Sequence, residues 1–121
     1  METTLREPAV AGSFYPGTAS ALERELQQLV TVSEERHQLL GCIAPHAGYV
    51  YSGGVAGELF GHLELPRRVV VLGPNHTGVG AKVAVAPHQR WRSPLGEQAV
   101  DVELAPVSYT HLRAHETRAF I

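Results

Sequence analysis

Two histidines, His46 and His76, stand directly after short apolar runs that have the composition of buried strands. His46 follows residues 39–44 and one proline, and His76 follows residues 68–72 and a Gly-Pro-Asn turn. In an open parallel sheet, ligands bind beyond the carboxyl ends of the strands, and the ends of neighbouring strands lie about 5 Å apart. Two imidazoles at that edge could share one divalent metal ion.

Each histidine also has a simpler interpretation. A single histidine after a strand is more often a turn or capping residue than a ligand, and only the pair at equivalent strand ends favours a shared function. Two histidines do not complete a metal site, because at least one further ligand is needed. His46 and His76 are therefore candidate metal ligands whose remaining partners this pattern does not identify.

The first element that positions them is a helix. Leucines at helical spacing predict it over about residues 19–32. Ser20 offers an N-cap, and Glu23, three residues later, would complete a capping box. Residues 33–38 are polar and predict a loop.

The segment that carries both histidines predicts a strand, a helix and a strand. Residues 39–44 predict a buried strand, Gly53 and Gly54 open a second helix, and residues 68–72 predict a central strand. Such a unit has parallel strands and a right-handed crossover. The helix ends at Pro66, and its predicted apolar face consists of Val55, Ala56, Leu59, Phe60 and Leu63.

The remaining sequence predicts weaker elements. Residues 83–86 predict a third strand, residues 89–97 a loop, and residues 100–105 the start of another element. Asp101 is expected to be a surface or helix-start carboxylate. Tyr49 and Tyr51 flank the His46 turn, where their hydroxyls could reach a substrate or simply pack half-exposed.

Composition limits the class of protein. The chain has 121 residues, 44% of them hydrophobic and 18% charged, which fits one packed domain. A net charge of −2 with scattered basic residues indicates no basic surface for binding nucleic acid. Cys42, the single cysteine, excludes a disulfide scaffold and is expected to be buried in its strand. Without a signal peptide or an apolar run of about 20 residues, we expect a cytoplasmic protein that does not enter a membrane.

Four short sequence motifs are informative when they are considered as a set. They are Ala-Gly-Ser-Phe-Tyr at 11–15, Ile-Ala-Pro-His-Ala-Gly-Tyr-Val-Tyr-Ser-Gly at 43–53, Leu-Gly-Pro-Asn-His at 72–76, and Ser-Pro-Leu-Gly at 93–96. In order and spacing they resemble the Memo family, whose prokaryotic members are called AmmeMemoRadiSam system protein B. The resemblance extends from residue 6 to about residue 105.

The resemblance implies an α/β fold of three layers with a central, largely parallel sheet, similar to the class III extradiol dioxygenase (LigB-like) fold. It implies a pocket that contains His46, His76 and Phe14. On this basis His46 and His76 are predicted metal ligands, and Phe14, Tyr49 and Asn75 are predicted substrate-binding residues. No residue is assigned a catalytic role.

The family also implies a chemistry. A divalent transition metal, iron or copper, would support redox or dioxygenase-like reactions. Partners would be an AMME-type protein and a radical SAM enzyme of the same pathway. The alternative is a non-catalytic binding module that recognises a peptide or a partner protein, and a third metal ligand elsewhere in the protein would favour the first function.

Members of the family are more than twice as long as this chain. We therefore expect residues 1–106 to be the N-terminal part of a truncated Memo-like domain, inactive in isolation. Residues 107–121 resemble one reading frame of a sequencing adapter and are expected not to be native. Their alternative is a genuine polar C-terminal helix.

Overall fold

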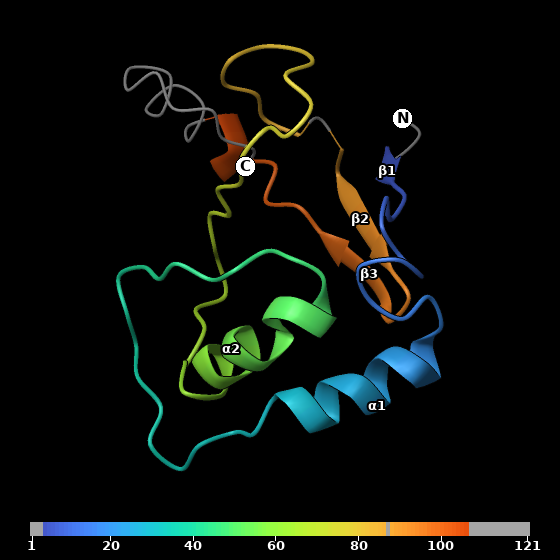
Figure 1. Cartoon of the computed structure of the whole chain (residues 1–121). Coiled ribbons are helices and arrows are strands. Elements are labelled where there is room, and N and C mark those ends of the chain that lie inside the picture. Colours follow the sequence, from blue (N-terminus) through green and yellow to red (C-terminus); the bar gives the residue numbers. More distant parts are fainter. Residues whose placement is uncertain (1–3, 87, 107–121) are drawn as a thin grey trace. The chain divides into compact units, whose positions relative to one another are not determined.

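A computed structural model describes residues 4–86 and 88–106 of the chain. Its elements are β1 (Leu5–Arg6), α1 (Ala19–Leu29), α2 (Tyr49–Gly61), β2 (Arg90–Ser93) and β3 (Gly96–Ala99), labelled in Figure 1. The predicted foreign segment, residues 107–121, lies outside the described residues. Neither helix of the described part is long and apolar enough to cross a membrane.

The chain divides into two compact units. The helical unit consists of Glu7–Arg67 and Arg92–Gly96 and contains both helices. The strand unit consists of the residues up to Arg6, Arg68–Trp91, and the residues from Glu97 onward.

Helix α1 begins at Ala19, as predicted, but with a different cap. Thr18 has an extended backbone, and its hydroxyl accepts a hydrogen bond from the Ala21 amide at 3.4 Å. The prediction of Ser20 as N-cap is wrong, because Ser20 already lies within the first helical turn. The helix ends at Leu29, three residues before the predicted end, where the backbone of Val30 becomes extended.

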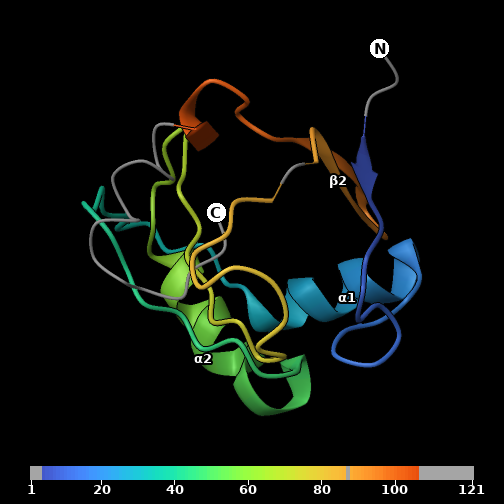
Figure 2. The same ribbon diagram turned by 90° about the horizontal axis from the view of Figure 1, so that it is seen from above.

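Helix α2 packs against α1 through glycines, and only part of the predicted apolar face is buried: Leu63 is 8% exposed, and Ala56 and Leu59 are half-buried. Figures 1 and 2 show the two helices side by side. Gly53, Gly57 and Gly61, spaced four residues apart, are buried, whereas Val55 is 64% exposed. A Cβ atom on Gly57 would lie 2.1 Å from the carbonyl oxygen of Leu29. Glycine therefore permits a backbone approach that no other residue allows at this position.

The start of α2 also differs from the prediction. The helix begins at Tyr49, four residues before the expected glycine pair. Its first amide, that of Tyr49, donates to the carbonyl oxygen of Phe14 at 2.8 Å. This contact satisfies one of the backbone amides that a helix N-terminus leaves without an intrahelical partner.

Three predicted strands are not strands in the structure. No strand is assigned to residues 39–44, 68–72 or 83–86, so the predicted parallel strand–helix–strand unit is wrong for the described chain. Leu40 and Ile43 are almost fully exposed, and Cys42, expected to be buried, is exposed as well. The physical reason is that a strand needs continuous pairing of its amides and carbonyls with a neighbour; among the described residues no strand is assigned along these runs, and within 83–86 only Ala84 forms a single bridge.

The strands that do form build a small sheet in the order β1-β2-β3. β1 pairs in parallel with β2, Leu5 opposite Arg90 and Arg6 opposite Trp91, and the Arg6 guanidinium lies 4.3 Å from the centre of the Trp91 ring. β2 and β3 form a hairpin in place of the predicted loop at 89–97. The α/β class is confirmed, whereas the three-layer architecture with a central parallel sheet is not.

Asp101 begins a helical turn, which confirms its prediction as a helix-start carboxylate. Its Oδ1 accepts hydrogen bonds from the amides of Leu104 at 2.9 Å and Glu103 at 3.2 Å. Its Oδ2 forms an ion pair with the Nε of Arg68. The hydrogen bond from Arg68 and those from the two amides lower the pKa of Asp101 from 3.8 to about 2.

We predict an acid-dependent contribution of Asp101 to stability. Because the pKa is lower in the folded chain than in the unfolded one, the carboxylate stabilises the fold above pH 3.8, and this contribution is lost as the pH falls through about 2. The melting temperatures of the wild type and of Asp101→Asn should therefore differ at pH 5 and converge toward pH 2. The difference in melting temperature between the wild type and Arg68→Gln should shrink over the same pH range. A difference that stayed constant from pH 5 to pH 2 for both variants would contradict the prediction.

Candidate functional site

The helical unit contains a cavity of about 330 Å³. Its walls are formed by α1, α2 and the two turns that precede them, and most of its lining is apolar or aromatic. The lining residues are Val10, Phe14, Tyr15, Leu26, Leu29, Val30, Pro45, His46, Ala47, Tyr49, Ser52, Gly53, Ala56, Gly57 and Phe60. Three residues of the predicted site, Phe14, His46 and Tyr49, thus line the same cavity.

A tight turn before α1 positions Phe14. Its amide and that of Ser13 both donate to the carbonyl oxygen of Val10, at 2.9 and 3.1 Å. Gly12 has a φ of +83°, a left-handed conformation that favours glycine, and its amide donates to the carbonyl oxygen of Tyr15 at 2.8 Å. The turn therefore fixes the backbone of Phe14, whose carbonyl in turn receives the first amide of α2.

Tyr49 presents a protonated hydroxyl. Its ring lies 5.6 Å from that of Tyr15, centre to centre, at an angle of 40°. Burial raises the pKa of Tyr49 above its ordinary value, and the nearby Tyr15 and Glu25 raise it further. At neutral pH the hydroxyl is therefore a hydrogen-bond donor and carries no charge.

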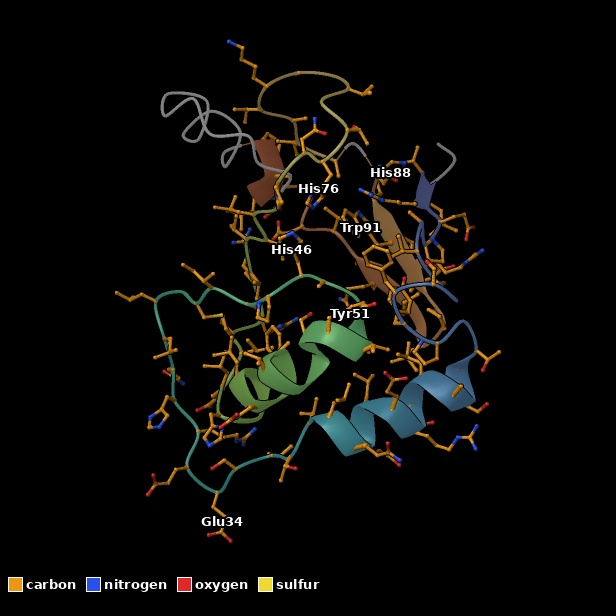
Figure 3. All side chains as sticks on the ribbon, viewed as in Figure 1. Glu34, His46, Tyr51, His76, His88 and Trp91 are labelled. Carbon is orange, nitrogen blue, oxygen red and sulfur yellow. The ribbon has the colours of Figure 1, made fainter. Side chains whose placement is uncertain are left out.

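His46 is exposed at the edge of the cavity, on the segment that leads into α2 (Figure 3). Ser52 holds this segment: its buried hydroxyl donates to the carbonyl oxygen of Ala47 at 2.8 Å and to that of Gly48 at 3.5 Å. Sequence reasoning missed Ser52. The available signal was a serine in the first turn of a helix, from which a hydroxyl can reach carbonyls just before the helix.

Tyr51 does not share this environment. It lies on α2 in Figure 3, but its side chain is 86% exposed and is not among the cavity residues. Of its two predicted roles, half-exposed packing does not describe a side chain this exposed, and contact of its hydroxyl with a substrate stays a prediction.

His76 and Asn75 belong to the strand unit, on the loop that follows residues 68–72. His76 is exposed and Asn75 is half-buried. Because His46 and His76 belong to different units, their sharing of one metal ion stays a prediction. Among the residues that the structure describes, no three His, Cys, Asp or Glu side chains are grouped so that they could hold a metal ion. The two imidazoles are suitable nitrogen donors, but this part of the chain does not complete a donor set.

The family model and the individual relatives that match this chain indicate the same family. A family model described as "Memo-like protein" matches residues 6–117. A MEMO1 family protein of Methanosarcina mazei is 47% identical over 102 residues, which cover 84% of this chain and 38% of the relative. One of Aquifex aeolicus is 38% identical over 122 residues, covering 92% and 46%, and one of Thermococcus onnurineus is 47% identical over 107 residues, covering 84% and 36%. The chain therefore spans less than half the length of these relatives.

Proposed function

The chain belongs to the Memo-like protein family, and from this premise we propose that its helical unit binds a small molecule in the cavity between α1 and α2. The observation that carries the proposal is the placement of Phe14, His46 and Tyr49 around one cavity. A volume of about 330 Å³ lies within the usual range for small-molecule sites.

The lining defines the class of ligand. Aromatic rings and aliphatic side chains make up most of the wall, so burial of an apolar, preferably planar body would provide most of the binding energy. Polar contacts are few. The Tyr49 hydroxyl donates a hydrogen bond, and the His46 imidazole can donate or accept one. The proposed ligand is therefore a compact ring compound with one polar substituent.

For the whole protein, we extend the proposal to a divalent transition metal, iron or copper. His46 and His76 would supply two imidazole nitrogens, which suit either ion. Any further ligand would have to come from outside the described residues, because these contain no third donor in position. The metal would contribute redox or dioxygenase-like chemistry, and the two histidines would hold it.

A binding module for a peptide or partner protein is the second candidate. The face of α2 directed away from α1 favours it, because Tyr51 and Val55, four residues apart on that face, are 86% and 64% exposed. Exposed apolar clusters on a surface mark sites of protein association. A partner of this kind would contact that face and would leave the cavity unfilled.

The cavity proposal can be tested with benzyl alcohol and toluene, which differ in one hydroxyl group. Chemical shifts of Tyr49 and of its neighbours should follow both compounds in an NMR titration. Ala56→Phe fills the cavity and should weaken the binding of both by at least about tenfold, the equivalent of roughly 1.4 kcal/mol. Tyr49→Phe removes only the hydroxyl and should weaken benzyl alcohol alone, by about fivefold for a hydrogen bond of ~1 kcal/mol.

Val55→Phe is the matched control, because it adds the same ring one residue away on the exposed face of the helix. It should leave both affinities unchanged. Equal affinities in Ala56→Phe and Val55→Phe would rule out the cavity as the binding site. Loss of binding to a peptide or partner in Val55→Phe alone would instead support the binding module.

A further inference from the structure

The loop that carries His76 is organised by the side chain of Asn75. The amide oxygen Oδ1 accepts three hydrogen bonds, from the Thr77 amide at 3.1 Å, the Thr77 hydroxyl at 3.0 Å and the Gly78 amide at 3.0 Å. The amide nitrogen Nδ2 donates to the carbonyl oxygen of Val79 at 2.9 Å. The Asn75 side chain is thus hydrogen-bonded to the backbone of the three residues that follow His76.

These bonds use most of the hydrogen-bonding capacity of the Asn75 side-chain amide. The amide oxygen has two lone pairs and already receives three donors, and one of the two N–H groups is already donated. Thr77 extends the network, because its hydroxyl accepts the Val79 amide at 3.2 Å. Gly78, with a φ of +69°, allows the chain to fold back over Asn75. Little of the Asn75 side chain is left for a substrate.

We propose that Asn75 is a positioning residue, which fixes the backbone of residues 75–79 and thereby the direction in which His76 leaves the loop. The inference deepens the proposed function, since it assumes that His76 acts on a ligand or metal. It replaces the substrate contact predicted for Asn75 with an indirect role. The residue type fits this role, because alanine would make none of the four bonds and aspartate would keep only the accepting ones.

The first test is the order of the loop in the full chain. In Asn75→Ala, the Gly78 and Thr77 amides should exchange with solvent faster, and the NMR order parameter of the His76 amide should fall from about 0.85 toward 0.6. Asn75→Asp retains the three accepted bonds and should restore most of the protection. Unchanged order at His76 in Asn75→Ala would overturn the proposal.

The second test uses Zn²⁺ alone as a probe, followed through the ring resonances of His76. Residues that orient a ligand typically cost about 10–100-fold in metal affinity when they are replaced. Asn75→Ala should show a loss of this order with little change in melting temperature, since the loop is exposed. Thr77→Val, which removes the hydroxyl that bonds to Asn75 and Val79, should shift the affinity in the same direction by less. No effect of Thr77→Val beside a loss in Asn75→Ala would indicate direct contact by Asn75 and would contradict positioning.

His76→Ala separates the two proposals. Because this variant lacks the His76 ring, its Zn²⁺ binding is measured by calorimetry, and binding equal to that of the wild type would count against the metal role of His76. The order of the loop in Asn75→Ala would still decide whether Asn75 positions this residue.

Discussion

Replacement of Gly57 by alanine is expected to lower the free energy of unfolding by about 3 kcal/mol, at the upper end of the usual cost of overpacking. The added Cβ would lie 2.1 Å from the carbonyl oxygen and 2.7 Å from the carbonyl carbon of Leu29. Both atoms belong to the backbone of α1, so no side chain can rotate away. The two helices would have to separate, and the contacts along their interface would be lost.

Gly54→Ala is the control within the same helix. A Cβ on Gly54 meets no atom within 4 Å, so alanine should increase stability by about 0.5–1 kcal/mol through its better helix propensity. Urea denaturation followed by circular dichroism measures both variants. If Gly57→Ala proved as stable as Gly54→Ala, the close approach of α1 and α2 would be contradicted.

The second large effect is expected at Leu22. This side chain of α1 is only 3% exposed, and its truncation to alanine should cost about 2–5 kcal/mol through lost burial and the cavity left behind. Leu40 provides the same substitution at a fully exposed position and should change stability by less than about 0.5 kcal/mol. The comparison is made at the urea midpoint, and similar midpoints for the two variants would mean that Leu22 is not part of the core.

The helices could be predicted from the sequence because their signals are local. Leucine spacing and the start at Ala19 depend on residues within one or two turns, and α1 lies where the pattern places it. The face of α2 could not be predicted in this way. Hydrophobicity patterns assign the buried side to large apolar residues such as Val55, whereas the interface is made by glycines, which such a pattern does not weigh.

The strands could not be predicted from local sequence. The runs at 39–44 and 68–72 have a strand composition, but a strand also requires a partner, often distant in sequence, and composition does not say whether one is present. The hairpin at 90–99 was missed because its strands are short and exposed, with no apolar alternation.

The candidate site was partly predictable. The motif residues Phe14, His46 and Tyr49 meet at one cavity because a turn and a helix start, both local structures, bring them together. The supporting role of Ser52 depends on a hydroxyl that reaches back five residues, which no motif specifies. The network around Asn75 is likewise visible only once the fold of the loop is known.

The exposed run at 69–72 affects how copies of the chain behave toward one another. Three valines and a leucine in succession, each 42–68% exposed, have the composition that stacks into cross-β fibrils. Arg67 and Arg68 precede this run and Pro74 follows it, and such flanking residues act as gatekeepers against stacking. Asp101 pairs with Arg68 and so leaves less of the arginine's charge to repel a neighbouring copy. Arg67 and Pro74 are therefore expected to provide most of the protection against fibril growth at this segment.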